Sequence, residues 1–377
     1  MRTEQNRTEQ NRTEQNRTEQ NRTEQNRYKW IDGIKGLVAW GIVLLHYNTF
    51  FANTDRGLPL QSVLFPFYQY GNLGVEFFFI ASGFLMINAY ENKLDEYNFF
   101  SFMGKRLRRL IPLAWIGTIW AIFNKLFSIY FLGLDVSKIS TPINTYTIIC
   151  NFLFINGSFI ESFDSFDGPL WFICQLIVCY IIFYVVFKYC KKEKTVYCVF
   201  CLFFCLIGYT IFHFKFNFAF LWENNGRGML TFFIGCLIFF INKNIIKKCL
   251  ILMLMLLDLI IIICANIYGS TIVYGNTGDN MRLTWILLIW PSLFLFLLNF
   301  STIASIFEVK LLRYLGAISM PVYIFHWPIL QSIVIINNIF SFDFDFTQVK
   351  TLFFIIMVII VLADIVHRYI ENKLIFW

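Results

Sequence analysis

The sequence predicts an all-α integral membrane protein with about ten transmembrane helices and both termini in the cytoplasm. Hydrophobic residues make up 58% of the 377-residue chain, aromatic residues 20% and charged residues only 15%. A soluble domain has no core large enough to bury that much apolar surface. A bilayer span needs roughly 20 mostly apolar residues, and such stretches follow one another along this chain. Hydrocarbon cannot satisfy the polar groups of open strands, so the spans are predicted to be helices.

The chain begins with Met1 and five copies of Arg-Thr-Glu-Gln-Asn. This polar, charge-balanced repeat has nothing to bury and lacks the apolar core of a signal peptide. Residues 1–27 are therefore predicted to form a disordered tail before an uncleaved first helix. If its codons are AGA ACA GAA CAG AAC, they repeat the five-base unit AGAAC, and gain or loss of one unit would switch expression by phase variation. The alternative is an ordinary low-complexity tail, and sequencing the gene decides between the two.

Residues 28–377 are predicted to form one ten-helix membrane domain. The expected spans lie near residues 33–52, 72–90, 110–132, 169–189, 195–213, 227–242, 248–268, 282–300, 316–338 and 348–370. The apolar segment at 145–157 is too short to cross a bilayer, so it is predicted to be an interfacial or re-entrant piece within a long loop.

The basic residues lie in short loops between apolar runs, which indicates membrane topology and argues against nucleic-acid binding. The basic clusters are KRLRR at 105–109, KYCKKEK at 188–194, NKNIIKK at 242–248 and KLLR at 310–313. They fall in alternate loops, which the positive-inside rule assigns to the cytoplasm. Cys198, Cys201 and Cys205 have no second ligand pair nearby, so no metal site is predicted.

The first span contains the ionisable residues Lys35 and His46. Eleven residues at 100° each bring them within about 20° of one helix face, about 16 Å apart along the axis, with His46 near the outer end. An ionisable side chain inside a membrane is a functional candidate. The structural alternative is a Lys that reaches the inner interface and an unrelated interfacial His.

Glu76 lies near the outer end of the second predicted span, at about the depth of His46. A carboxylate beside an imidazole fixes its tautomer and raises its basicity, as a general base requires. The sequence therefore predicts that Glu76 orients His46, the alternative being a Glu wetted by the outer interface. The Ala81-Ser82-Gly83 patch that follows predicts close helix packing.

Six motifs, in order and spacing, resemble the membrane acyltransferase family three over residues 29–373. They are IDGIKGLVAWGIVLLHY, GVEFFFIASGFLM, KRLRRLIPLAW, GPLWFICQLIVCY, LLRYLGAISMPVYIFHWPI and HRYIENKL. The resemblance implies that His46 is catalytic and places Lys35 where the family has an Arg, which keeps the charge but loses a bidentate fork. It places Glu76 at an acidic position that is usually Asp.

The resemblance also matches Arg106 and Arg109 to basic positions that attract the phosphates of CoA, although positive-inside anchoring explains them equally. Arg227 matches a family Arg and is a candidate for binding the acceptor or the acyl carbonyl, or an interfacial anchor. His326, two positions before Pro328, belongs to the family pattern. Trp171, at the outer mouth of its helix, fits either sugar stacking or the interfacial aromatic belt.

These residues imply a stand-alone membrane O-acyltransferase of the bacterial cytoplasmic (inner) membrane, without an appended hydrolase-like domain and with its site open toward the outer side. It would move an acyl group, expected to be acetyl, from cytoplasmic acyl-CoA (acetyl-CoA) to a hydroxyl of a surface polysaccharide such as O-antigen, capsule or exopolysaccharide, or of its lipid-linked precursor. No bound cofactor or metal is implied. The alternatives are a glycan or small-solute transporter or flippase with a His/carboxylate proton relay, and an acyltransferase for a lipid or small metabolite.

Overall fold

The structure is a computed structural model, and it describes residues 28–52, 57–91, 93–157, 159, 163–189, 193–216, 218–242, 247–269, 273 and 278–376. The predicted N-terminal tail lies outside these residues. Within them the chain is helical, without strands, and ten helical segments are long and apolar enough to cross a membrane. The predicted all-α membrane fold and the number of spans are therefore confirmed, and the cytoplasmic location of the two termini stays a prediction.

The first five spans are formed by α2 (Lys29–Phe51), α3 with α4 (Gln61–Tyr70 and Gly74–Tyr90), α6 (Ile111–Leu132), α8 (Trp171–Tyr189) and α9 (Lys194–Phe214). The other five are α10 (Glu223–Asn242), α11 (Lys248–Tyr268), α13 with α14 (Gly278–Thr284 and Trp290–Asn299), α17 (Ser319–Phe340) and α18 (Val349–Val366). Short helices connect them: α5 (Phe99–Leu107), α7 (Thr145–Phe152), α15 (Ser301–Ala304), α16 (Lys310–Ala317) and α19 (Asn372–Phe376).

The second span is longer than predicted, because helical structure begins at Gln61 and not near residue 72. Pro66 and Gly71 indicate a loop in this stretch, yet the chain stays helical through both. A Cβ atom on Gly71 would lie 2.1 Å from the carbonyl oxygen of Gly41 in α2. The glycine is thus required by the close approach of two backbones, and packing against α2 explains why the helical path continues.

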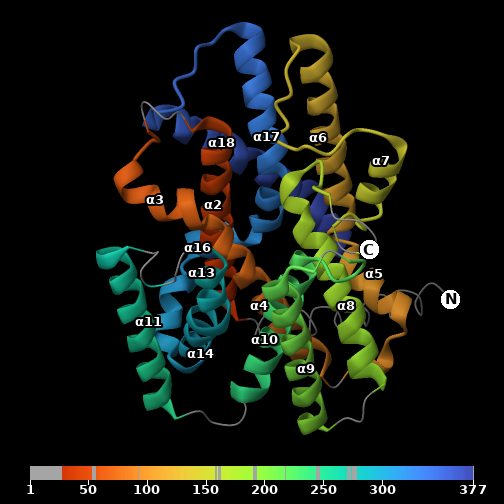
Figure 1. Cartoon of the computed structure of the whole chain (residues 1–377), viewed down its shortest axis with the longest axis vertical. Coiled ribbons are helices and arrows are strands. Elements are labelled where there is room, and N and C mark those ends of the chain that lie inside the picture. The colour runs from red at the N-terminus through yellow and green to blue at the C-terminus, as the bar shows by residue number, and fades with distance from the viewer. Residues whose placement is uncertain are drawn as a thin grey trace, which may run out of the picture.

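The helices differ in how much of them the rest of the protein covers (Figure 1). The apolar stretches of α10 and α17 are each 78% buried, whereas that of α11 is 11% buried and lies at the edge of the bundle. A lipid-facing helix needs only an apolar surface, but a central helix brings polar side chains together away from lipid. The functional residues are accordingly expected on the central helices.

The helices α4 and α10 pack with their backbones in close contact. A Cβ atom on Gly83 would lie 1.9 Å from the carbonyl oxygen of Phe232, and one on Gly235 would lie 2.1 Å from that of Ile80. Small residues permit such an approach, which is a common way for helices to associate in membranes. The packing role predicted for the Ala81-Ser82-Gly83 patch is confirmed.

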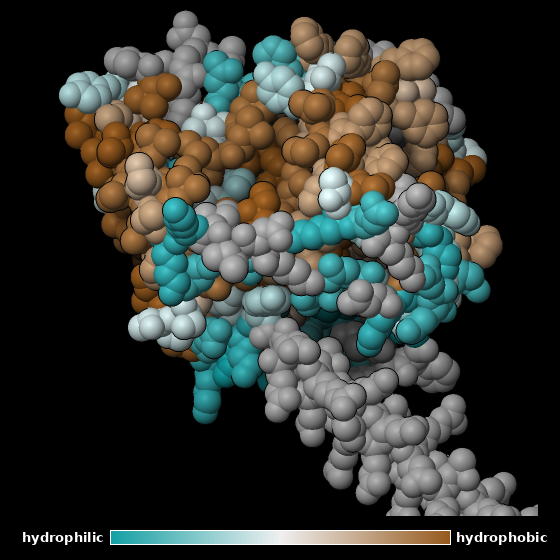
Figure 2. All heavy atoms as spheres, turned by 90° about the horizontal axis from the view of Figure 1, so that it is seen from below, coloured by the Kyte–Doolittle hydropathy of each residue, from teal (hydrophilic) through white to brown (hydrophobic). Residues whose placement is uncertain are grey.

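We call the two ends of the bundle the basic end and the loop end. The basic end carries the short connections with Lys105–Arg109, Lys188, Lys194, Lys248 and Lys310. The loop end carries residues 57–60, 133–157, 163–167, 215–216, 218–222 and 341–348. Seen from below, hydrophilic side chains gather in a band beside a hydrophobic surface (Figure 2). That the basic end faces the cytoplasm stays a prediction from the distribution of Lys and Arg.

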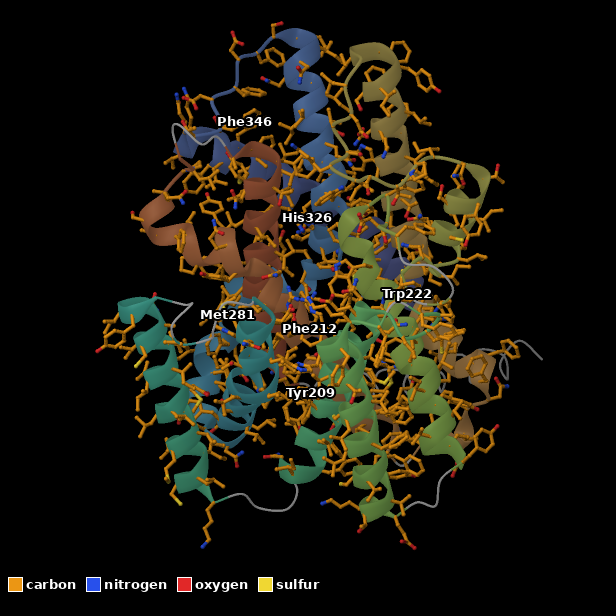
Figure 3. All side chains as sticks on the ribbon, viewed as in Figure 1. Tyr209, Phe212, Trp222, Met281, His326 and Phe346 are labelled. Carbon is orange, nitrogen blue, oxygen red and sulfur yellow. The ribbon has the colours of Figure 1, made fainter. Side chains whose placement is uncertain are left out.

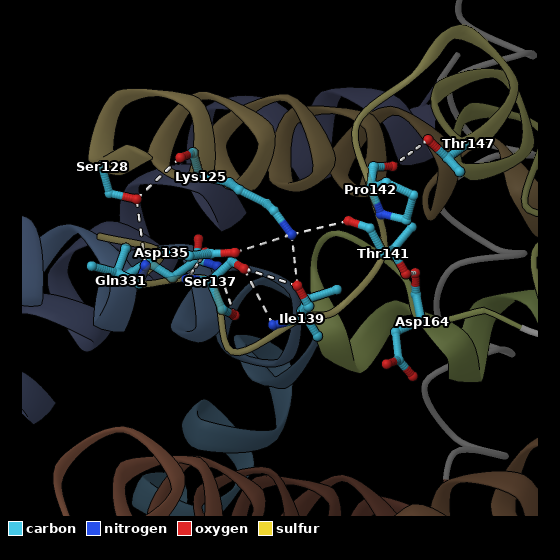
Figure 4. A network of polar contacts seen from close by, with 11 residues as sticks. Lys125, Ser128, Asp135, Ser137, Ile139, Thr141, Pro142, Thr147, Asp164 and Gln331 are labelled. Carbon is cyan, nitrogen blue, oxygen red and sulfur yellow. Dashed lines mark hydrogen bonds and ion pairs between the residues drawn. The ribbon is translucent and has the colours of Figure 1, made fainter. Parts of the chain in front are cut away.

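The long connection after α6 is held against the bundle by one buried lysine (Figure 4). The Lys125 ammonium donates to the carbonyl oxygens of Ile139 at 2.6 Å and Thr141 at 2.9 Å, and lies 3.3 Å from the Asp135 carboxylate. Partial burial acts to raise the pKa of Asp135, but hydrogen bonds from Ser137 and the charge of Lys125 outweigh it, so the pKa lies below its ordinary value.

The segment predicted to be interfacial or re-entrant contains only the eight-residue helix α7. The indole N–H of Trp115, near the start of α6, donates to the carbonyl oxygen of Phe152 at 2.8 Å. The connection therefore folds back along α6 before it enters α8, as the prediction of a non-spanning segment requires.

Candidate functional site

Two histidines from distant parts of the chain meet in the centre of the bundle. The Nδ1 atom of His46, on α2, lies 2.7 Å from the Nε2 atom of His326, on α17, and the two rings are nearly parallel at 13°. His326 is fully buried, whereas the side chain of His46 is only half-buried. Figure 3 shows His326 on the central helix, with Phe346 above it toward the loop end.

The hydrogen bonds of this pair determine which nitrogen atoms carry protons. The Nδ1 atom of His326 lies 2.9 Å from the carbonyl oxygen of Val322, which can only accept, so this nitrogen is the donor. In the neutral ring Nε2 of His326 is then an acceptor and Nδ1 of His46 donates to it. The lone pair of His46 lies on Nε2, which makes no hydrogen bond to another described residue. His46 is thus arranged as a base.

Aromatic side chains surround the exposed part of His46. The indole of Trp327 meets its imidazole edge-on, with ring centroids 4.9 Å apart, and Phe50 meets the same indole at 4.9 Å. Such edge-to-face contacts fix ring orientations and exclude water. The aromatic shell holds the base in position and continues from His46 toward the loop end.

The predicted contact between Glu76 and His46 is not found among the described residues, and this prediction needs correction. Both carboxylate oxygens of Glu76 instead accept hydrogen bonds from Arg227, at 2.6 and 2.8 Å. Glu76 is fully buried and Arg227 is 6% exposed. A guanidinium offers two parallel donors that match a carboxylate, so it binds this acid more strongly than a neutral imidazole would. His326 occupies the place beside His46 that was expected for the acid.

Two further side chains complete the Glu76–Arg227 cluster. The guanidinium of Arg227 lies over the ring of Trp171, 4.7 Å from its centroid. A nitrogen atom of Arg282, on α13, lies 3.7 Å from the Glu76 carboxylate. The predicted site residues Glu76, Arg227 and Trp171 therefore come together, and Arg282 joins them although the sequence analysis did not single it out.

The remaining predicted site residues, Lys35, Arg106 and Arg109, line a cavity of about 590 Å³ at the basic end. Five cationic side chains face this cavity against the single carboxylate of Asp32: Lys35, Lys105, Arg106, Arg108 and Arg109. Lys35 lies 3.9 Å from Asp32, and Arg109 is paired with the buried Glu371. The buried Nε atom of Arg106 has no hydrogen-bond partner in the described part of the chain. This excess of positive charge suits an anionic ligand.

A path of side chains leads from this cavity to the histidine pair. Met320 and Phe78 line the cavity, and the Phe78 ring lies 5.9 Å from that of Tyr323. Tyr323 in turn lies 6.2 Å from the His326 ring. Met320 and His326 are six positions apart on α17, which is about 9 Å along the helix. Tyr323 and His326 are both buried, so packed side chains connect the cavity to the histidine pair.

A fully buried carboxylate, Asp167, lies close to α17. A Cβ atom on Gly117 would lie 2.6 Å from its Oδ2 atom and 2.8 Å from Ile324 of α17. Neither oxygen has a hydrogen-bond partner in the described residues, and burial raises the pKa of Asp167 well above its ordinary value. Asp167 therefore makes no hydrogen bond to the histidine pair among the described residues.

The eight predicted site residues thus form three groups. The groups are His46 with His326, then Glu76 with Arg227 and Trp171, then Lys35, Arg106 and Arg109 around the basic cavity. Sequence reasoning missed Trp327, although it directly follows His326, and it missed Arg282. The signal for Arg282 was an arginine at the start of an apolar span, which is a functional candidate by the same argument as His46.

Comparisons with known proteins identify one family. A family model described as an acyltransferase domain matches residues 28–367, which covers all ten spans up to the end of α18. No curated protein and no solved structure matches the chain.

Proposed function

Because the chain belongs to the membrane acyltransferase family three, we propose that it is an O-acetyltransferase. It takes the acyl group from cytoplasmic acetyl-CoA and transfers it to a hydroxyl of a surface polysaccharide or its lipid-linked precursor. The observation that carries the proposal is the His46–His326 pair, in which Nε2 of His46 makes no hydrogen bond to another described residue, together with a cationic cavity at the basic end. A cationic cavity near one end of α17 and a base nearer its middle suit a donor with an anionic head and a long arm.

The donor is held from the basic end. The phosphates of CoA bind among the Lys and Arg side chains of the cavity, where Arg106 and Arg109 offer planar, multidentate donors. The pantetheine arm extends past Met320 and Tyr323 and brings the thioester to His46. Lys35 lies nearer the basic end of α2 than His46 and faces the cavity. Its ammonium group contributes positive charge but cannot form a bidentate contact.

The transfer step uses His46 as the base. Its Nε2 atom takes the proton of the acceptor hydroxyl, the hydroxyl oxygen bonds to the thioester carbonyl carbon, and the carbon–sulfur bond breaks. The imidazolium then gives its proton to the departing thiolate. His326 accepts the Nδ1–H hydrogen bond of His46 throughout and keeps the ring oriented. An acyl-imidazole formed on His46 before attack by the acceptor is the second route, and it uses the same nitrogen.

The Glu76–Arg227 cluster supports the reaction and does not exchange protons with His46. Its bidentate pair ties α4 to α10, and Trp171 packs on the guanidinium near the start of α8. Tyr323 donates to the carbonyl oxygen of Pro169 at 2.7 Å, two residues before Trp171. These contacts fix the helices around the histidine pair, which positions donor and acceptor.

The proposed location is the bacterial inner membrane, with the loop end outward, where the acceptor glycan is assembled. Membrane vesicles that contain the protein, supplied with acetyl-CoA labelled in the acetyl group and with surface glycan, test the function. Label is expected to appear in the glycan and to be absent with His46→Ala. Glycan that stays unlabelled while the labelled acetyl-CoA is not consumed would overturn the proposal.

The rival function is transport of a glycan or solute by a His/carboxylate proton relay. The structure disfavours a relay through Glu76, because this carboxylate is held by Arg227 and makes no contact with His46 among the described residues. Solute uptake by the same vesicles without acetylation would establish the rival.

A further inference from the structure

A second cavity, of about 630 Å³, opens at the loop end between the ends of α2 and α17 and the connection at 341–348. Its volume falls in the range of small-molecule binding sites. The lining combines aromatic rings, Phe50 and Phe344 among them, with the amides of Asn337 and Asn338. Phe346, which Figure 3 labels above His326, also lines it. None of the predicted site residues belongs to this cavity.

The chemistry of the lining suits a sugar. A pyranose ring presents C–H groups on its faces and hydroxyls at its rim. Aromatic faces contact the former, and planar amide and carboxylate groups pair with the latter. The side chain of Asn338 is exposed and that of Phe344 is half-buried, so both are accessible. A lining that combines both kinds of group is matched to a carbohydrate better than to a lipid chain.

The charge of the cavity selects among sugars. Asp343 and Asp345 line it, and the described lining residues include no Lys or Arg. Asp345 is engaged by the backbone N–H of Thr347 at 3.0 Å, whereas the exposed Asp343 makes no hydrogen bond or ion pair to another described residue. The C-terminal ends of α2 and α17, at Phe51 and Phe340, lie at this end and add partial negative charge. An anionic sugar is repelled here, and a neutral one is not.

The cavity adjoins the histidine pair. Phe50 lines the cavity and lies one helical turn beyond His46 on α2. Its ring contacts Trp327 at 4.9 Å, and Trp327 contacts His46 at 4.9 Å. A sugar residue in the cavity is therefore separated from the base by two aromatic side chains, so it is not itself the unit from which His46 takes a proton.

We propose that this cavity binds a neutral sugar unit of the acceptor chain next to the unit that is acylated, and that Asp343 excludes acidic glycans. The proposal rests on the proposed transfer to a glycan hydroxyl. It names the acceptor class that the loop end admits: chains of neutral or amino sugars, and not of uronic acids or phosphodiesters.

The test uses the full chain in membrane vesicles with labelled acetyl-CoA. The acceptors are deacylated glycans released from cells of the source organism and separated by anion exchange into a neutral and an acidic pool. The variants are Asp343→Lys, Phe344→Ala and the control Asp164→Lys, which makes the same charge change on an exposed carboxylate elsewhere at the loop end. Initial rates give the KM for each pool, and release of CoA reports use of the donor.

The neutral pool is expected to be labelled at the lower KM. Asp343→Lys is expected to lower the KM for the acidic pool roughly fivefold, Phe344→Ala to raise the KM for the neutral pool, and Asp164→Lys to change neither. Preferred labelling of the acidic pool by the unaltered protein, or equal behaviour of Asp343→Lys and Asp164→Lys, would overturn this inference while leaving the acyltransfer intact. Labelling of neither pool, with no His46-dependent release of CoA, would remove the proposed function itself.

Discussion

The Nδ1 atom of His46 lies 2.7 Å from the Nε2 atom of His326, although 280 residues separate the two in the chain. The carbonyl oxygen of Val322 requires a proton on Nδ1 of His326. Nε2 of the neutral His326 ring is then an acceptor, so Nδ1 of His46 carries the proton between the two rings. The backbone carbonyl of Val322 thereby fixes the tautomer of the base, a role that a carboxylate has in many other sites. In the neutral form of His46, this arrangement leaves the lone pair of its Nε2 atom available.

Replacement of His326 tests this orienting role. His326→Ala removes the acceptor for the Nδ1–H of His46, and kcat is expected to fall roughly 10- to 100-fold, the size typical of groups that orient a histidine. His326→Gln is expected to recover part of the loss, because its amide oxygen can accept the same hydrogen bond. The measurement is kcat and the KM for acetyl-CoA of folded variants. Equal rates for the Ala and Gln variants would contradict the role.

Replacement of Arg227 is expected to lower the stability of the fold more directly than it affects the acyl-transfer step. Arg227→Met leaves the buried Glu76 carboxylate without its bidentate partner, and removal of one member of a buried pair costs about 3–5 kcal/mol. Arg282→Met is the control, because Arg282 lies 3.7 Å from the same carboxylate without a hydrogen bond. Thermal unfolding in detergent measures both. A fully stable Arg227→Met protein with a shifted pH–rate profile would instead favour coupling between Glu76 and His46.

The glycine contacts between α4 and α10 predict a steric effect. A Cβ atom on Gly83 would lie 1.9 Å from the carbonyl oxygen of Phe232, so Gly83→Ala must separate the two helices. The expected loss is about 1–3 kcal/mol in the free energy of unfolding. Gly104→Ala is the matched control, because nothing lies within 4 Å of its added Cβ atom. Equal free energies of unfolding for the two variants would contradict the close packing of α4 on α10.

Asp135 predicts how stability depends on pH. Its pKa in the folded protein lies below the unfolded value of about 3.9. Its interactions with Ser137 and Lys125 therefore stabilise the fold above the unfolded pKa, and this contribution is lost as the pH falls through the folded pKa. Asp135→Asn is expected to lower the unfolding temperature at neutral pH and to converge with the unaltered protein in acid. A constant difference between the two at every pH would show that the charge is not responsible.

The membrane fold could be predicted from the sequence because hydropathy reports directly on burial in lipid. The ten spans follow from runs of apolar residues, and the segment at 145–157 was recognised as too short by length alone. The start of the second span was missed because Pro66 and Gly71 are signals of a break, and only the contact with Gly41 explains the glycine. Local signals thus fail where tertiary packing decides.

The pairing of the site residues could not be predicted in the same way. Depth along each helix is readable from the sequence, and it placed His46 and Glu76 at a similar level. Rotation about each helix axis and the order of helices around the bundle are not readable from single segments. Arg227 faces Glu76 and His326 faces His46 because of that order.

The initial rate of acetyl transfer by a folded His46→Ala protein tests the central claim most directly. The variant keeps the cationic cavity, so the KM for acetyl-CoA is expected to stay within about twofold, while kcat falls roughly 10²–10⁴-fold. A kcat close to that of the unaltered protein would show that the His46–His326 pair does not carry the chemistry.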